Sequence, residues 1–201
     1  MKFGLKQTLA FAIFIAIGTA TAATNDVIEG NRDANVKVTI FSDLQCDYCQ
    51  SFRTMLDEKL LPKYGKDVAF IHRDMPLPRH DWARSAAMAA RWVDGQDSRL
   101  GPVFRRELLA EQEHITKNSL KSWLIEFASR NKLSEQGIVA AMSDPQLGAM
   151  VDRDMQMGAT RGVKTLPAVY VGGQTFVETI VYDDIARVLD QELGRTGVPR
   201  Q

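Results

Sequence analysis

Residues 41–49 read Phe-Ser-Asp-Leu-Gln-Cys-Asp-Tyr-Cys and contain the only two cysteines of the chain, Cys46 and Cys49. Beyond them, apolar side chains recur in steps of three, four and four, at Cys49, Phe52, Leu56 and Leu60. This spacing predicts a helix that begins at the pair and follows a strand. Cys49 falls on the apolar stripe of that helix, whereas we expect Cys46 to be exposed at its start. Such a pair can form a disulfide within itself, and its first sulfur can attack a sulfur of another molecule.

The first residues have the pattern of a secretory signal peptide. A positively charged start precedes an apolar run over residues 9–17, and small residues ending in Ala-Thr-Ala-Ala follow. The apolar run is too short to span a bilayer, and no second apolar segment follows it. We therefore expect residues 1–23 to be a signal peptide cleaved near Ala22 or Ala23, and the mature protein, residues 24–201, to be exported to the periplasm.

Charge and cysteine content narrow the function. The chain has 25 basic and 25 acidic residues, and removal of Lys2 and Lys6 leaves 23 against 25, a net charge of −2. This balance does not indicate nucleic acid or an anionic membrane surface as a partner. Cysteines of exported proteins usually form structural disulfides. A disulfide that closes so short a loop stabilises little, however, and a domain of ~180 residues hardly needs one. The pair is better explained by reactivity.

The remaining elements follow from periodicity and turn residues. Alternating apolar residues predict one strand over residues 36–41 and another over 68–72, and Pro62 should end or bend the helix between them. A helical block follows, with candidate helices over 81–94, 102–112, 118–131, 135–142 and 145–159. Two strands around a Gly-Gly turn and an amphipathic terminal helix complete the chain, at 167–171, 174–177 and about 185–193. The order is a β-α-β unit and a β-β-α unit separated by helices.

Three segments of this pattern carry a resemblance to a known family. They are residues 41–49, Arg-Asp-Met-Pro-Leu at 73–77, and Gly-Val-Lys-Thr-Leu-Pro at 162–167. They resemble the DsbA-type branch of the thioredoxin superfamily, and the likeness covers about residues 27–193. The resemblance implies an α/β thioredoxin fold with a mixed central sheet. It also implies a single domain over 24–201 with a helical subdomain inserted at about 78–160.

The resemblance implies that Cys46 is the catalytic nucleophile and Cys49 the thiol that resolves mixed disulfides. A helix N-terminus favours negative charge, so the pKa of Cys46 should lie below the free value of about 8.5. Strongly oxidising relatives carry a histidine between the cysteines, whereas Asp47 and Tyr48 stand here, with Asp43 close before. Nearby carboxylates oppose the thiolate. We therefore expect Asp47 and Tyr48 to tune the pair to a depressed but not extreme pKa, and to a weaker oxidant than the strongest family members.

Two further positions depend on the resemblance. Many relatives have a buried acid six residues before the first cysteine, as proton acceptor for the resolving thiol, but Ile40 occupies this place. The proton must then pass through water, another side chain or Tyr48. Proline after a residue other than proline is usually trans, yet the family implies a cis Pro167 facing the dithiol. The backbone of Leu166 would then bind an extended substrate segment as an added strand.

The leading prediction is an exported thiol–disulfide oxidoreductase that introduces disulfides into reduced or misoxidised exported proteins. It needs no cofactor, and the family implies reoxidation by a membrane partner of the DsbB or vitamin K epoxide reductase type. Dedicated isomerases carry an N-terminal dimerisation region. Only about 13 mature residues precede the first predicted strand here, which favours a monomer.

Alternatives remain at the same pair of cysteines. The protein could be kept reduced, as a disulfide reductase or isomerase, or it could bind a metal through the dithiol. A zinc site from Cys46, Cys49, His72 and His80 is disfavoured, because four-ligand sites usually show a second paired motif. Haem attachment is excluded because Gln50 follows the pair where a histidine is required. We expect both histidines to be structural or solvated.

Overall fold

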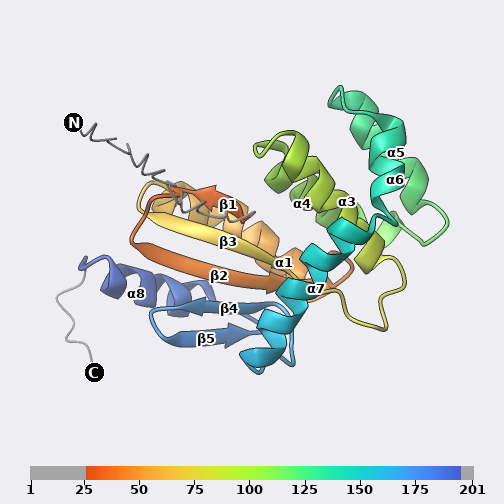
Figure 1. Ribbon diagram of the computed structural model, residues 1–201. Helices are drawn as coiled ribbons and strands as arrows, with labels where there is room; N and C mark the ends of the chain where they lie inside the picture. The colour runs from red at the N-terminus through yellow and green to blue at the C-terminus, as the bar shows by residue number, and fades with distance from the viewer. Residues whose placement is uncertain (1–25, 196–201) are drawn as a thin grey trace, which may run out of the picture.

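The computed structural model describes residues 26–195, so the predicted signal peptide and its cleavage site lie outside the described residues. The centre of the fold is a five-stranded sheet in the order β1-β3-β2-β4-β5 (Figure 1). In chain order the strands are β1 Val27–Gly30, β2 Val36–Ser42, β3 Val68–Asp74, β4 Ala168–Val171 and β5 Gln174–Val177. Strands β2 and β3 are parallel and the other neighbours are antiparallel. The predicted mixed sheet is confirmed.

Strand β1 is absent from the sequence-based prediction, which placed the first strand at residue 36. It pairs antiparallel with β3, and Val27 lies opposite His72. Its four residues read Val-Ile-Glu-Gly, which is too short a run to show the alternation that marks a strand. The predicted count of about 13 mature residues before the first strand was therefore wrong, since β1 already begins at Val27.

The helices follow the predicted order with small shifts at their ends. Behind the dithiol come α1 Asp47–Met55, η1 Leu56–Leu60 and α2 Leu61–Tyr64. The inserted block holds α3 Ala83–Gln96, α4 Leu100–Glu111, η2 Gln112–His114, α5 Leu120–Arg130, α6 Glu135–Ala141 and α7 Pro145–Thr160. Helix α8, Tyr182–Glu192, ends the fold. Within residues 26–195, none of these helices has the length and apolar character needed to cross a membrane.

Pro62 does not end the first helix. The chain continues in helical form to Tyr64, and the stretch Leu56–Leu60 just before the proline is a π-helix. Proline cannot donate the usual backbone hydrogen bond and its ring crowds the preceding turn. A π-turn changes the backbone pairing locally, so the helix passes Pro62 without a break.

The two faces of the sheet are covered by different helices. Ile40 points to the face where Phe52 and Leu56 of the first helix pack together with Ile185 of α8. The next residue, Phe41, points to the opposite face, toward α7. There a Cβ on Gly158 would lie only 3.2 Å from the Phe41 ring, so glycine permits the close approach of this helix. Helices α3 to α6 lie beyond the carboxyl ends of the central strands, as Figure 1 shows in green.

A buried ionic cluster joins the sheet to the inserted helices. Asp74 at the end of β3 accepts hydrogen bonds from Arg91 Nε of α3 at 2.5 Å and Arg105 Nη1 of α4 at 2.8 Å. Arg91 also pairs with Asp154 of α7, which accepts the Asp74 backbone N–H at 2.9 Å. All four side chains are at most 5% exposed. Charged contacts thus connect three helices to the end of one strand.

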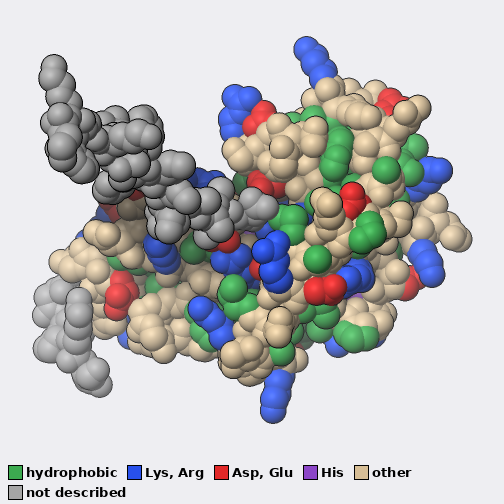
Figure 2. Space-filling model, viewed as in Figure 1, with side chains coloured by type: hydrophobic (Ala, Val, Ile, Leu, Met, Phe, Trp, Pro, Cys, Tyr) green, Lys and Arg blue, Asp and Glu red, His purple; other side chains and the backbone are tan. Residues whose placement is uncertain are grey.

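The surface charges are mixed. On the face shown in Figure 2, lysine and arginine side chains are dispersed among acidic and apolar ones rather than gathered into one patch. This distribution agrees with the near balance of acidic and basic residues in the sequence.

Candidate active site

The dithiol lies where β2 ends and α1 begins. Cys46 is the N-cap of α1, with an extended backbone (φ −102°, ψ 124°), and its carbonyl accepts the first helical hydrogen bond from Gln50 N–H at 3.0 Å. Cys49 lies one turn further on. Both are free thiols. The predicted exposure of Cys46 is wrong, since the residue is only 4% exposed, against 1% for Cys49.

The two sulfurs differ in acidity. The pKa of Cys46 is lowered to about 6, first by a hydrogen bond from the Cys49 thiol and then by the backbone N–H groups of Cys49 and Tyr48. Burial and the negative charge of Asp43 oppose this lowering. The pKa of Cys49 is raised well above its usual value, by burial and by its interaction with the Cys46 sulfur. At neutral pH the pair therefore carries one thiolate, on Cys46, and one thiol, on Cys49.

Asp43 is the carboxylate that the structure places beside the pair. It is 1% exposed and accepts hydrogen bonds from Leu77 N–H at 2.6 Å, Gln45 N–H at 2.6 Å and His80 Nδ1 at 2.8 Å. Its own backbone N–H points to Cys49 Sγ at 3.4 Å. Its charge raises the pKa of Cys46, which is the effect expected of nearby carboxylates.

His80 was expected to be structural or solvated, and it contacts the buried carboxylate of Asp43, which lies beside the dithiol. Only the fold brings the two residues together, since they are 37 positions apart in the chain. A histidine between Arg79 and Asp81 gives no local sign of this contact.

The two residues between the cysteines have different surroundings. The Asp47 carboxylate accepts a hydrogen bond from Gln112 Nε2 at 3.3 Å. The side chain of Tyr48 is 48% exposed, and its backbone N–H is the part that acts on Cys46. A tuning role of the Asp47 charge and the Tyr48 ring stays a prediction.

Leu166 and Pro167 lie at the same end of the sheet as the dithiol. The peptide bond between them is cis. Phe41 of β2 pairs with Ala168 of β4, so the residues just before Ala168 lie next to the segment that leads to Cys46. The Pro167 carbonyl accepts a hydrogen bond from Glu178 N–H at 3.0 Å, which leaves it occupied.

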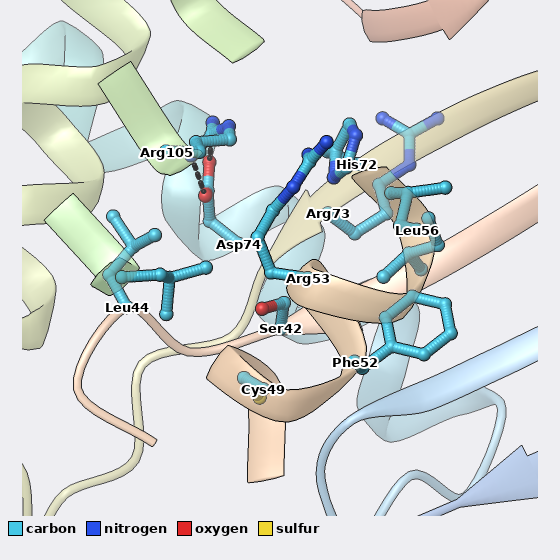
Figure 3. A pocket seen from close by; sticks show the side chains of 12 residues that line it. Ser42, Leu44, Cys49, Phe52, Arg53, Leu56, His72, Arg73, Asp74 and Arg105 are labelled. Carbon is cyan, nitrogen blue, oxygen red and sulfur yellow. Dashed lines mark hydrogen bonds and ion pairs between the residues drawn. The ribbon is translucent and has the colours of Figure 1, made fainter. Parts of the chain in front are cut away.

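Behind Cys49 lies a small cavity of about 20 Å³. Figure 3 shows Ser42 between Cys49 on one side and His72 and Asp74 on the other, all of them lining this cavity. Ile40 lines it too, so the position of the family's buried acid is apolar here. Within residues 26–195, no three His, Cys, Asp or Glu side chains come together as metal ligands, and His72 pairs with Glu29 at 2.7 Å.

The acidity of Cys46 can be measured directly. We expect the thiolate absorbance of the reduced protein to rise with a midpoint near pH 6 and to correspond to one sulfur per molecule. A lowered pKa in the folded state stabilises the reduced protein fully above the unfolded pKa of 9.0, and this stabilisation is lost as the pH falls through about 6. Three units correspond to about 4 kcal/mol at most.

Asp43→Asn offers the matched variant for this titration. It keeps an acceptor for the backbone N–H groups and removes the charge that opposes the thiolate, so the midpoint should move to lower pH. A midpoint near pH 3.5 in the wild-type protein, or an unchanged midpoint in the variant, would contradict this electrostatic account.

A free dithiol at a helix N-terminus, beside a mixed five-stranded sheet that carries an inserted helical block, is an arrangement suited to thiol–disulfide exchange. A family model described as thioredoxin matches residues 22–191, and the chain belongs to this family.

Three solved structures of similar fold illustrate the likeness. BdbD from Bacillus subtilis superposes with a TM-score of 0.76 at 21% identity, covering 85% of this chain and 94% of that one. The thiol-disulfide exchange protein α-DsbA2 from Wolbachia pipientis gives 0.72 at 19%, covering 85% and 88%. ScsC from Proteus mirabilis gives 0.70 at 20%, covering 86% and 74%. At these identities the likeness concerns the fold.

A curated relative is a much longer protein. The Na(+)/H(+) antiporter NhaA of Herminiimonas arsenicoxydans is 27% identical over 157 residues, which make up 74% of this chain. The matched part spans only 22% of the antiporter.

Proposed function

We propose that the protein is an exported thiol–disulfide oxidoreductase that introduces disulfides into other exported proteins. The observation that carries the proposal is that the two neighbouring sulfurs have pKa values shifted in opposite directions. The lowered pKa of Cys46 gives a thiolate, and the raised pKa of Cys49 keeps it a thiol. A thiolate attacks and leaves readily in thiol–disulfide exchange, whereas a thiol does neither.

The proposed reaction begins with oxidised protein. A substrate thiolate attacks Cys46 Sγ, the Cys46–Cys49 bond breaks, and Cys49 leaves with the electron pair and takes up a proton. A second substrate thiolate then attacks the substrate sulfur of the mixed disulfide, and Cys46 leaves as the thiolate. Two electrons pass from the substrate to the protein, and the substrate gains one disulfide.

Low exposure of Cys46 restricts the substrate. At 4% exposure, the sulfur is accessible to an extended segment more readily than to the surface of a folded protein. The backbone of Leu166, two residues before the Ala168 that pairs with Phe41 of β2, is the candidate site where such a segment binds as an added strand. Leu166 and Pro167 thus form the proposed substrate site, and unfolded or misoxidised exported chains the proposed substrates.

The cellular setting follows the same proposal. A signal peptide over residues 1–23 would direct the mature chain to the periplasm. The reduced protein would return its two electrons to a membrane partner of the DsbB or vitamin K epoxide reductase type, and it would act as a monomer.

A reductase is the second candidate, and the acidity of Cys46 is the reason to keep it. A pKa of about 6 lies between the values for thioredoxin, about 7, and for DsbA, about 3.5. A less stable thiolate means a weaker oxidant. By this comparison the pair should be a weaker oxidant than DsbA and a stronger one than thioredoxin, so both directions of exchange stay candidates.

Equilibration with glutathione buffers at pH 7 distinguishes the two candidates. We expect a potential clearly more oxidising than the value of about −270 mV for thioredoxin. The fraction of oxidised protein is measured by mass spectrometry after the free thiols have been alkylated. A potential at or below the thioredoxin value would sink the oxidase proposal in favour of the reductase.

A further inference from the structure

In either direction of the exchange, a proton must be transferred to or from the Cys49 sulfur. Its thiol must lose a proton before it can attack a mixed disulfide, and its thiolate must gain one when it leaves. The residue is 1% exposed, and its raised pKa shows that the thiol is the stable form. Bulk solvent therefore does not reach the sulfur directly. Ile40 next to it carries no acidic or basic group.

The cavity behind Cys49 offers the missing route. Its volume of about 20 Å³ is enough to hold one water molecule, which needs about 10–15 Å³. Ser42 lines it and hydrogen-bonds to the Cys49 sulfur. Arg105 lines it as well, and its buried Nε has no hydrogen-bond partner within residues 26–195. A buried N–H without a partner is a common sign of a bound water.

His72 stands at the far side of this cavity as a base. Its Nε2 lies 2.7 Å from Glu29 Oε1. Burial alone would raise the pKa of Glu29, but His72 and Arg53 together hold it well below its usual range, so this carboxylate is ionised and only accepts hydrogen bonds. The hydrogen of His72 is thus on Nε2, and Nδ1 carries a lone pair. Burial lowers the pKa of His72, as do the charges of Arg53 and Arg105, while Glu29 opposes them.

Two other carboxylates, those of Asp74 and Asp43, already accept hydrogen bonds from several donors. Asp74 lines the cavity but receives Arg91 and Arg105, which keep its pKa low and make it a weak base. Asp43 receives two backbone N–H groups and His80. Of the described residues that line the cavity, only His72 is a histidine, and its neutral ring has an unprotonated nitrogen that can accept a proton.

We propose that Ser42 and one water in the cavity carry the Cys49 proton to and from Nδ1 of His72, with Glu29 as the residue that holds the ring in position. This inference rests on the proposed function, because it concerns the same exchange. On resolution of a mixed disulfide, the Cys49 proton passes through Ser42 and the water to His72. The Cys49 thiolate attacks Cys46 Sγ, the Cys46–Cys49 bond forms, and the bound partner leaves as a thiolate. The return step on the leaving Cys49 uses the same path.

The test measures one step of the exchange. Reduced protein is mixed with oxidised glutathione, and acid-quenched samples are followed by mass spectrometry. The Cys46–glutathione adduct first forms and then disappears as Cys49 attacks it. We expect His72→Gln, which can still donate to Glu29 but cannot take up the proton, to slow the disappearance about 10²-fold at pH 7. The deficit should shrink as the pH rises, because hydroxide then removes the Cys49 proton.

Two further variants make the result specific. Ser42→Ala should show the same pH-dependent slowing and does not touch the Glu29 pair. Tyr64→Phe removes a buried hydroxyl bonded to the Ala186 carbonyl at 3.3 Å, away from the cavity, and should resolve the adduct at the wild-type rate. Adduct formation by Cys46 should be unchanged in all of them.

Each outcome decides one claim. The proton path is overturned if His72→Gln and Ser42→Ala resolve the adduct as fast as the wild type, or more slowly by one constant factor at every pH. It is also overturned if only Asp43→Asn shows the pH-dependent slowing. Failure of the wild-type protein to form any adduct at Cys46 would instead defeat the proposed function.

Discussion

Replacement of Cys46 by serine is expected to lower the rate of disulfide formation in a reduced, unfolded substrate protein by at least about 10³-fold, because the nucleophile is removed. A serine hydroxyl is not ionised at neutral pH, and it cannot form a mixed disulfide. The rate is measured as recovery of activity of a reduced test enzyme, with the oxidised protein as the only oxidant. Undiminished recovery with Cys46→Ser would rule out the mechanism.

Cys49→Ser is the matched control for that experiment. It keeps the N-terminal thiolate and removes only the resolving sulfur. We expect it to react with a small disulfide at Cys46 and to stop as a stable mixed disulfide, visible as an adduct of one partner per molecule. Because the Cys49 thiol also hydrogen-bonds to the Cys46 sulfur, serine preserves a donor at this position. A variant that forms no adduct would show that Cys46 does not act as the nucleophile.

Asp74→Asn is expected to destabilise the folded protein by about 3–5 kcal/mol, because the buried guanidinium groups of Arg91 and Arg105 both lose the negative charge of Asp74, and only Arg91 keeps a pair with Asp154. The free energy of unfolding is measured with urea. Both guanidinium groups stay buried in the variant, so water cannot solvate their charges in place of Asp74. The ionised Asp74 has a lowered pKa, so its contribution is present at neutral pH and is lost as the pH falls below the unfolded value of about 3.9.

Asp152→Asn is the control for this second prediction. It breaks an ion pair with Arg84 on the surface, where both side chains are at least 46% exposed. Such pairs contribute at most about 1 kcal/mol. If both variants lose the same small amount, the cluster at Asp74 does not stabilise the junction between sheet and insertion.

Most of the fold could be predicted because its signals are local. The hairpin strand over 174–177 agrees with the structure to the residue, and its turn residues, Gly172 and Gly173, have the positive φ of 56° and 78° that such turns require. The helix expected at 135–142 is observed at Glu135–Ala141. Apolar periodicity and turn chemistry act over a few residues, so the sequence shows them directly.

The site was predictable only in part. The positions of Cys46 and Cys49 follow from their spacing, and the moderate acidity expected for Cys46 agrees with a pKa of about 6. The burial of Cys46 does not follow from spacing, since residues from other elements cover it. A local pattern shows where a helix begins, but it does not show what packs on that end.

The charged residues behind the dithiol were missed for the same reason. Glu29 and Arg53 are 24 positions apart, and Asp74 and Asp154 are 80 apart. In the sequence each reads as an ordinary surface residue, because charged side chains are seldom buried. Only the approach of strands and helices from distant parts of the chain turns them into buried pairs.

The burial of Cys46 also bears on chemical damage. Peroxides oxidise the thiolate form of cysteine, and the damage increases with both ionisation and accessibility. At neutral pH Cys46 is ionised, yet the residue is only 4% exposed. The packing around Cys46 thus limits the access of small oxidants in solution to a thiolate that still reacts with a disulfide bound at the site. The side chains that surround the reactive sulfur therefore protect a protein that alternates between dithiol and disulfide from irreversible oxidation.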